Sequence, residues 1–403
     1  INASTINGDA SELIDIYSTN ASSYTNLGNE AVTIDNTASA NDVDTIAGAT
    51  SGIVTATIST DSASNLISNL SNANSSDALT LSLNGTNVSA SDLNTLNTKT
   101  SIDIDASGIN EITGSYSELN TLYSSGGITG LGNEELSVNG APSSSDINNL
   151  IGQTSGTITL SGGNNDTLNL GAVDSNLDLG AGNDTVTMDF SNLTSADSID
   201  FGSGGNDTLN LNGGGVINDL DFSNISNLDT LNLSSSNDTI TLGSNTAAAI
   251  EGNNDSINGN AGDDTFNLDF SNIGNFSIDG GSDTTGDKVV LTGSVSNVTS
   301  DTEFAPAASF ENIEELDITG LNSGSGFASD NTNEFIFTSS MLDNWIGSNS
   351  GSFKLTLTAA QAEDITFTDQ GGQVHDTTDA GLSNISSTSY SLDADTTLVI
   401  DIQ

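Results

Sequence analysis

Apolar and polar residues alternate in short segments throughout residues 1–160, and each such segment predicts a β-strand. The pattern is clear in AVTID (31–35) and IVTATIS (53–59), where every second residue is apolar or β-branched. The same alternation recurs in four further segments, which are 79–85, 101–107, 135–140 and 157–162. We therefore expect about one short strand in each repeat of this region.

A second pattern lies between these strands and predicts short helices. An Asp or Ser is followed three residues later by an acid or amide, which is the spacing of a helix capping box. Apolar residues three or four apart follow each pair and would form one buried stripe. The six pairs are Asp9–Glu12, Ser39–Asp42, Ser62–Asn65, Ser89–Asp92, Ser115–Glu118 and Ser143–Asp146.

Strand and helix together recur at intervals of 23 to 30 residues, so the N-terminal part is a repeat array. TNLGNEAV (25–32) also returns as TGLGNEEL (129–136), which indicates a larger duplication. One strand and one short helix cannot bury a core alone, whereas stacked repeats share one. The sequence predicts a mainly β protein that begins with an elongated strand–helix solenoid over 1–160.

Short segments rich in glycine, asparagine and aspartate recur through the next region, 161–293. Examples are SGGNNDTLNL (161–170), LGAGNDTVTMDF (179–190) and GNAGDDTFNLDF (259–270), with D-F-S-N recurring at 189, 221 and 269. The last region, 294–403, has strand-like segments without a clean repeat. We predict three domains: a solenoid over 1–160, a β-roll over 161–293 and a β-rich domain over 294–403.

Charge narrows the range of partners. The chain carries 54 acidic residues against 3 Lys and Arg together, a formal net charge of −51. Nucleic acids and anionic membranes need basic residues for binding, so both are excluded as partners. No apolar run is long enough to span a membrane, and there is no cysteine for disulfide or thiol chemistry. The low Pro content and regular apolar spacing favour folding over disorder.

The glycine-rich middle region resembles the calcium-binding RTX nonapeptide, G-G-x-G-x-D-x-U-x. LGAGNDTVT (179–187), GSGGNDTLN (202–210) and GNAGDDTFN (259–267) match it well, and SGGNNDTLN (161–169) matches in part. The metal-ligating candidates on this match are Gly162, Asn164, Asp166, Gly180, Gly182, Asn183, Asp184, Gly205, Asp207, Asp255, Gly262 and Asp264. Asp238 and Asp255 stand in degenerate copies.

The residue types agree with that chemistry. Glycine permits positive φ in a tight turn, and aspartate supplies a hard oxygen, which suits Ca²⁺. The apolar residue two places after each Asp is expected to point inward. The resemblance implies a β-roll in which several Ca²⁺ ions bridge neighbouring coils. The alternative is a metal-free β-solenoid in which Asn and Asp merely close Asx-turns.

The combination resembles RTX-bearing secreted surface proteins of Gram-negative bacteria, including S-layer subunits and giant cell-surface proteins. That family implies type I secretion, a cell-surface location and Ca²⁺-triggered folding. The first residue, Ile1, is neither an initiator Met nor part of a signal peptide, so we expect a processed product or a piece of a larger protein.

Three functions follow as hypotheses. The first is a non-enzymatic structural protein, a subunit of an S-layer, sheath or filament that self-assembles with Ca²⁺ and contacts cell-surface polysaccharide. The second is a calcium-dependent adhesin or biofilm-matrix protein. The third, an RTX-bearing polysaccharide lyase or epimerase, is disfavoured because such sites commonly need Arg, Lys or His to stabilise uronate charge.

Overall fold

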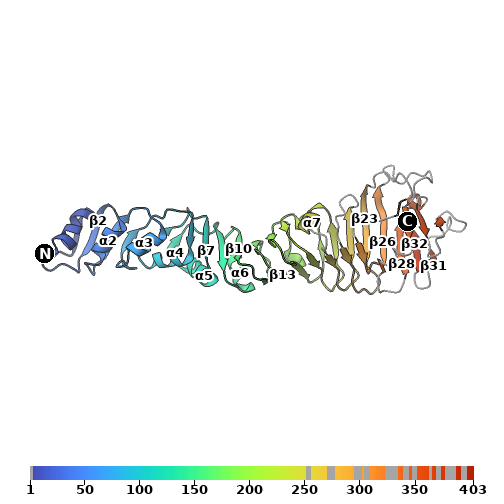
Figure 1. The fold of residues 1–403 in the computed structure, drawn as a ribbon, viewed down its shortest axis with the longest axis horizontal. Coiled ribbons are helices and arrows are strands. Elements are labelled where there is room, and N and C mark those ends of the chain that lie inside the picture. Colours follow the sequence, from blue (N-terminus) through green and yellow to red (C-terminus); the bar gives the residue numbers. More distant parts are fainter. Residues whose placement is uncertain are drawn as a thin grey trace. The chain divides into compact units, whose positions relative to one another are not determined.

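The computed structural model is built mainly from short parallel β-strands with a few short helices (Figure 1). It describes residues 3–250, 256–269, 277–294, 302–303, 309–322, 335–338, 345–346, 352–362, 365–368, 374–376, 387–391 and 397–403. The chain forms two compact units, here called unit 1 (residues 1–162 and 176–178) and unit 2 (163–175 and 179–403). The predicted mainly β fold class is confirmed, and the three-domain division remains a prediction.

Strands of unit 1 pair in parallel with strands of neighbouring repeats. One sheet has the order β1-β2-β3-β4, another contains β5-β7-β9-β10-β12, and β6 pairs with β8. The bounds are β1 Thr5–Gly8, β2 Ala31–Ala38, β3 Val54–Ile58, β4 Ala78–Thr80, β5 Asn87–Ser89, β6 Ile104–Asp105, β7 Glu111–Ser115, β8 Ile128–Thr129, β9 Glu135–Asn139, β10 Ile158–Ser161 and β12 Asn176–Asp178. All six predicted strand segments contain a strand, but those at 79–85 and 101–107 are shortened.

Six α-helices lie within residues 3–162, and all begin directly after a predicted capping residue. Their bounds are α1 Ala10–Ile14, α2 Ala40–Ala47, α3 Ala63–Asn69, α4 Ala90–Asn97, α5 Tyr116–Ser124 and α6 Ser144–Ile151. A short π-helix (Asp15–Thr19) and a 3₁₀ turn (Ala21–Ser23) extend the first repeat. The six helix starts predicted from the sequence are confirmed.

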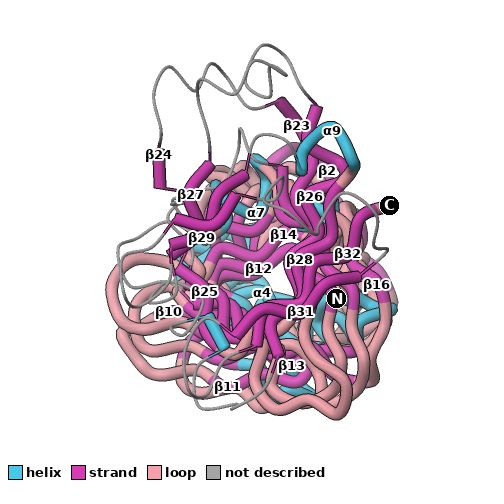
Figure 2. Tube along the Cα trace, turned by 90° about the vertical axis from the view of Figure 1, so that its right-hand side faces the viewer, coloured by secondary structure: helices cyan, strands magenta, loops and turns pink. Residues whose placement is uncertain are grey.

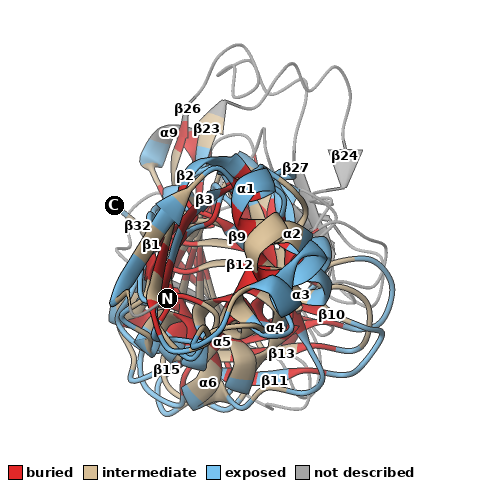
Figure 3. Cartoon of the chain, turned by 90° about the vertical axis from the view of Figure 1, so that its left-hand side faces the viewer, coloured by how far each residue is buried: buried red, intermediate tan, exposed pale blue. Residues whose placement is uncertain are grey.

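Apolar side chains of the strands and helices meet inside unit 1. In the strands, Val32 lies in register with Val54, and Ala56 lies in register with Leu79. The helices contribute side chains such as Val43 and Ile46, which are fully buried in the same core. Figure 3 colours each residue by its burial: the strands carry many buried residues, and the loops are mostly exposed. Repeats that are individually too small to fold thereby share one core.

Unit 2 contains two long, mainly parallel sheets. The first has the order β11-β13-β15-β18-β20-β22-β25, and the second has the order β16-β19-β21-β23-β26-β28-β32-β31. The bounds are β11 Thr167–Asn169, β13 Thr185–Asp189, β15 Thr208–Asn212, β16 Val216–Ile217, β18 Thr230–Asn232, β19 Thr239–Leu242, β20 Ser256–Asn258, β21 Thr265–Asp269, β22 Ser277–Asp279, β23 Lys288–Ser294, β25 Ser309–Glu311, β26 Glu315–Asn322, β28 Ser352–Leu357, β31 Ser387–Ser391 and β32 Thr397–Ile402. Figure 2 shows β26, β28 and β32 side by side.

Smaller elements complete the described part of unit 2. The pair β14 (Ser198–Asp200) and β17 (Ile225–Ser226) is parallel, as are β24 (Thr302–Glu303), β27 (Phe335–Thr338) and β29 (Ile365–Thr368). Two strand pairs are antiparallel: β29 with β30 (Val374–Asp376), and β31 with β32. The helices are α7 (Ser244–Ala249) and α9 (Ala359–Ala362), and two 3₁₀ turns are Phe190–Asn192 and Asp219–Phe222.

Two columns of apolar side chains form the core of unit 2. The first runs through the first sheet, and each member lies in register with the next: Leu168, Val186, Leu209, Leu231, Ile257, Ile278 and Phe310. The second runs through the second sheet: Ile217, Ile240, Phe266, Val289, Leu316, Leu355 and Ile400. All of them are buried. The inward direction predicted for the residue two places after each Asp is confirmed at every described copy.

The D-F-S-N segments at 189 and 221 place Phe190 and Phe222 in the core, and each of the two residues is part of a short 3₁₀ turn. The third copy lies mostly outside the described residues. Across the part of the chain that the structure describes, no helix is long and apolar enough to cross a membrane.

Candidate metal-binding turns

The predicted ligand residues that the structure describes lie in turns that precede strands of unit 2, and Gly162 itself belongs to unit 1. The glycines adopt the positive φ that the motif predicts: 127° at Gly162, 87° at Gly180, 155° at Gly182, 122° at Gly205 and 125° at Gly262. Side chains with a Cβ rarely adopt this conformation. The glycine positions of the motif therefore have the backbone role expected of them.

Close stacking of the turns gives a second reason for glycine. A Cβ at Gly182 would lie 2.1 Å from the carbonyl oxygen of Asn164, and a Cβ at Gly205 would lie 1.6 Å from that of Gly182. Each turn thus rests directly on the backbone of the turn before it. Asn164 belongs to this stack through its main chain.

Three predicted aspartates form one column with a fourth that the motif missed. Oδ1 of Asp184 accepts a hydrogen bond from the backbone N–H of Asp166 at 2.8 Å. Oδ1 of Asp207 accepts from the N–H of Asp184 at 2.7 Å, and Oδ2 of Asp229 accepts from the N–H of Asp207 at 2.7 Å. We call Asp166, Asp184, Asp207 and Asp229 the first acidic column.

A second acidic column belongs to the other long sheet. It consists of Asp238, Asp264, Asp287 and Glu314. Asp264 and Asp287 each accept, through Oδ1, from the N–H of the previous acid at 2.7 Å, and Oε2 of Glu314 accepts from the N–H of Asp287 at 2.9 Å. Asp238 accepts from the N–H of Gly215 at 2.8 Å. Asp207 and Asp238 thus belong to different columns, which explains the irregular spacing between them in the sequence.

The asparagines before Asp166 and Asp184 accept hydrogen bonds from the opposite side, that is, from the following turn. The side-chain oxygen of Asn165 accepts from the N–H of Asn183 at 2.9 Å, and that of Asn183 accepts from the N–H of Asn206 at 3.0 Å. An Asn-Asp pair therefore joins its turn to both neighbouring turns. Asn183, predicted as a metal ligand, has its oxygen engaged in this backbone contact.

The columns leave particular carboxylate oxygens without a protein partner. Oδ2 of Asp184, Asp264 and Asp287 is buried and forms no hydrogen bond with the described residues. These three residues are at most 1% exposed. A buried oxygen of a carboxylate that lacks a partner is costly, because its desolvation is not compensated.

The pKa values of the buried aspartates are raised for the same reason, because burial disfavours the charged carboxylate. Burial raises the pKa of Asp264 to about 7; the hydrogen bond from the Asp238 backbone opposes this, and the charges of Asp238 and Asp263 add to it. Burial likewise raises the pKa of Asp287 to about 8, with contributions from Asp264, Glu314 and Asp283. In the first column, burial also raises the pKa of Asp166, Asp184 and Asp207. A cation beside these groups would favour their charged forms.

One acidic cluster gathers three residues that are able to hold a metal ion. Asp283, Asp287 and Glu314 each contribute a carboxylate oxygen, and these oxygens lie within 4.8 Å of one another. Asp287 is buried, and the other two are partly exposed. None of the three was among the predicted ligands, although GGSDTTGD (280–287) closes the series of glycine-rich turns.

The predicted ligands are therefore distributed over two columns. Asp166, Asp184 and Asp207 lie together in the first, and Asp264 lies in the second. Asp255 lies outside the described residues. Which of them bind Ca²⁺ stays a prediction.

No protein-family model, curated protein or solved structure matches the chain. The likeness to calcium-binding repeats therefore depends on the residues of the turns themselves.

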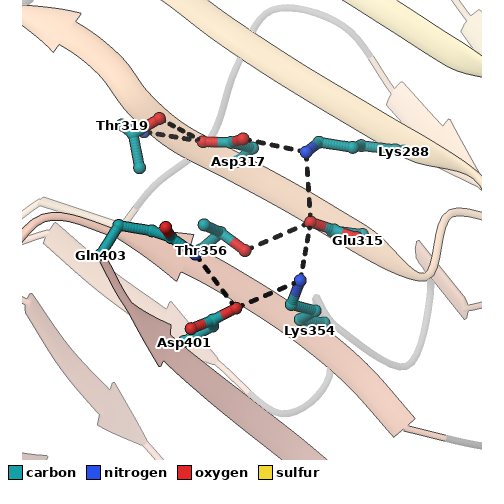
Figure 4. A network of polar contacts seen from close by, with 8 residues as sticks. All are labelled: Lys288, Glu315, Asp317, Thr319, Lys354, Thr356, Asp401 and Gln403. Carbon is teal, nitrogen blue, oxygen red and sulfur yellow. Dashed lines mark hydrogen bonds and ion pairs between the residues drawn. The ribbon is translucent and has the colours of Figure 1, made fainter. Parts of the chain in front are cut away.

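Basic side chains are concentrated elsewhere in unit 2. Lys288 lies 2.9 Å from Asp317 and 3.3 Å from Glu315, and Lys354 lies 3.2 Å from Glu315 and 3.3 Å from Asp401 (Figure 4). These residues alternate in sign across β23, β26, β28 and β32. The network balances acids on one sheet face by cross-strand pairing.

Proposed function

We propose that the chain is an extracellular structural protein, a subunit of an S-layer, sheath or filament that Ca²⁺ stabilises and helps to assemble. The observation that carries this proposal is the pair of acidic columns along the stacked turns, in which six of the eight acids are buried. Unit 1 would be a strand–helix solenoid, and the glycine-rich part of unit 2 would be an RTX-like β-roll.

The solenoid part of the proposal is supported by the pairing of each strand with its equivalent in the next repeat. Such repeats contact mainly their neighbours and share a continuous apolar column. A protein of this kind resists bending and extension along the stack without needing a globular core. These are the properties that a surface layer or filament requires.

The Ca²⁺ part of the proposal is supported by the ligand chemistry. The turns offer carboxylate and carbonyl oxygens, and the chain contains no cysteine and one histidine. Calcium takes about six to eight oxygen ligands in flexible geometry, whereas transition metals commonly use nitrogen or sulfur. Buried oxygens without partners at Asp184, Asp264 and Asp287 are the atoms that would gain most from an ion.

A structural role also accounts for the acidic residues better than catalysis does. Asp184, Asp207 and Asp264 each accept a hydrogen bond from the backbone of a neighbouring turn, so their carboxylates join repeats. A lyase or epimerase acting on uronates would need basic groups at its site, and the chain has only three lysines and no arginine. We propose secretion to the cell surface, with other copies of the chain and cell-surface polysaccharide as partners.

The test compares the purified chain in EDTA with the chain in millimolar CaCl₂. We expect Ca²⁺ to raise the midpoint of thermal unfolding followed by circular dichroism, and to produce lattices or uniform filaments in negative-stain images. The same unfolding midpoint and the same assembly state in both buffers would contradict the proposal. Isolated rods with a distinct tip would instead support the calcium-dependent adhesin.

A further inference from the structure

We propose that Asp283, Asp287 and Glu314 bind one Ca²⁺ ion that links the turn before β23 to the turn before β26. This inference rests on the proposed calcium dependence and assigns it to a site outside the residues that the nonapeptide pattern selects. We call these three residues the 283–314 site. Its geometry, its supporting contacts and its ligand chemistry carry the argument.

The first observation is the unpartnered oxygen of Asp287. Its Oδ1 accepts from the N–H of Asp264 at 2.7 Å and so points to the preceding turn. Its Oδ2 is buried and forms no hydrogen bond with the described residues. Oδ2 is therefore the atom available to a cation, and the residue is fully buried.

The second observation is the convergence of two more carboxylates on this residue. One oxygen from each of the three side chains lies within 4.8 Å of the others. Two oxygens bound to one Ca²⁺ ion, at roughly 2.3–2.6 Å each, are at most about 5 Å apart. Every pair of these oxygens satisfies that limit, so the three side chains meet the distance condition for sharing one ion. Without an ion, three negative charges at this distance repel one another.

The third observation is that hydrogen bonds hold both turns in place. The exposed carboxylate of Asp263 accepts from the N–H groups of Thr284 (2.9 Å) and Thr285 (2.8 Å), which fixes the turn that carries Asp283. Glu314 is held by the bond from its own N–H to the carbonyl oxygen of Asp287, 3.0 Å long. The site is thus preorganised by backbone contacts.

The ligand set favours Ca²⁺ over other common ions. Three carboxylates and no nitrogen or sulfur ligand suit a hard cation. Mg²⁺ usually keeps several waters and takes one or two carboxylates, so a partly buried site with three carboxylates selects the larger ion. The ion would neutralise most of the charge and connect residues 27 positions apart in the sequence.

The experiment measures Ca²⁺ binding to the full chain by isothermal titration calorimetry after removal of metal with EDTA. The variants are D283N, E314Q and the double variant, because Asn and Gln keep an acceptor oxygen while removing charge. Asp174, an exposed acid in a loop of unit 2, provides the matched control D174N. Circular dichroism in EDTA verifies that every variant has the wild-type fold.

We expect the double variant to lose one equivalent of Ca²⁺, or to bind it at least tenfold more weakly, while D174N matches the wild type. A tenfold excess of Mg²⁺ should leave the wild-type Ca²⁺ stoichiometry unchanged; displacement of that equivalent by Mg²⁺ would contradict the choice of ion. Unchanged stoichiometry and affinity in the double variant would overturn the site.

The outcomes separate the site from the proposed function. If Ca²⁺ stabilises and assembles the wild type and the double variant equally, the 283–314 site is wrong and the proposed function stands. If the wild type binds this ion and Ca²⁺ produces no lattice or filament, the site stands and the proposed function is wrong. A wild type that binds no Ca²⁺ at millimolar concentration overturns both.

Discussion

Glu30 and Glu134 are buried acids with equivalent surroundings 104 residues apart, and each is 1% exposed. Glu30 accepts from the N–H groups of Gly28 (2.9 Å) and Asn29 (3.1 Å), and from the hydroxyl of Tyr17. Glu134 has the same contacts with Gly132, Asn133 and Tyr123. The repeated GLGNE and NLGNE segments therefore form the same local structure. In each, the buried carboxylate accepts hydrogen bonds from backbone N–H groups of the loop that precedes it.

The substitution E30Q tests this device. Burial raises the pKa of Glu30, but the hydrogen bonds from Tyr17, Gly28 and Asn29 lower it more, so the net pKa is below the usual value. The carboxylate thus adds stability above the unfolded-state pKa, and this contribution is lost as the pH falls through the folded-state pKa. We expect E30Q to lower the free energy of unfolding by about 1–3 kcal/mol at pH 7, and by less as the pH falls below about 4.

Urea unfolding at pH 7 and at pH 3–4 measures this difference. The exposed neighbour of Glu134 supplies the control E135Q, which should change stability little at either pH. A destabilisation by E30Q that is the same at both pH values would show that the charge of Glu30 is not responsible.

Helix starts are set by a few residues at the element scale. Ser115 and Glu118 form a complete capping box before α5: the N–H of Ser115 donates to Oε2 of Glu118 at 2.8 Å, and the N–H of Glu118 donates to Oγ of Ser115 at 3.4 Å. These N–H donors have no partner inside the helix, so removing the cap leaves them without a hydrogen bond and destabilises the helix. Short helices depend on such caps more than long ones.

We expect S115A to lower the free energy of unfolding by about 0.5–2 kcal/mol. S117A, on the exposed side of the same helix, is the control and should change it by a few tenths of a kcal/mol at most. Chemical unfolding followed by circular dichroism measures the change in the free energy of unfolding for both variants. Equal effects of the two variants would argue against the cap.

The stacked turns of unit 2 also belong to the element scale. Two adjacent glycines there show two separate reasons why a position requires glycine. Gly204 and Gly205 both have positive φ, 82° and 122°. A Cβ at Gly204 would meet nothing within 4 Å, whereas one at Gly205 would meet the carbonyl oxygen of Gly182 at 1.6 Å. The first position requires glycine for its conformation alone, and the second requires it for conformation and space.

We therefore expect G204A to destabilise the fold by about 1–2 kcal/mol, the usual cost of positive φ for alanine, and G205A to cost substantially more. The midpoint and slope of urea unfolding give both values. If G205A were no worse than G204A, the turns would not be in direct backbone contact.

At the scale of the whole molecule, a net charge of −51 opposes folding because like charges repel in a compact state. Two of the three lysines are used in the network on β23, β26, β28 and β32. We expect cations from solution to neutralise the acidic columns. Ionic conditions should consequently control stability.

We expect NaCl to raise the unfolding temperature moderately by screening, since the Debye length falls to about 10 Å at 0.1 M. CaCl₂ at matched ionic strength should raise it several degrees further, because bound ions stabilise only the folded state. Differential scanning calorimetry in the two salts measures the effect. Identical unfolding temperatures at each ionic strength would mean that calcium acts only by screening.

The N-terminal elements were largely predictable because their signals are local. A capping residue and its partner three positions later decide where a helix begins, and α1 to α6 all begin there. Short strands such as β5 and β8 escaped prediction because two or three residues give no usable alternation. Their pairing with neighbouring strands, rather than their own propensity, makes them strands.

The candidate site was predictable only in part. Aspartates within the nonapeptide pattern could be recognised, including Asp184 and Asp207, but Asp229 has no glycine-rich turn before it and still completes the first column. Glu314 was likewise missed, since it follows Asn312 and Ile313 rather than glycine. Asp229 and Glu314 join the columns only because the pairing of neighbouring strands places them beside Asp207 and Asp287.

The sequence by itself determined the mainly β class, the repeat period, the helix starts and the glycine positions, since each depends on neighbouring residues. Only the tertiary structure decided which acids share a column, because pairing between repeats joins residues 18 to 27 positions apart at unequal intervals. It also decided which carboxylate oxygens are buried without a partner. The chain's large negative charge is a property of composition, but the places where a cation could relieve it are a property of the register between strands.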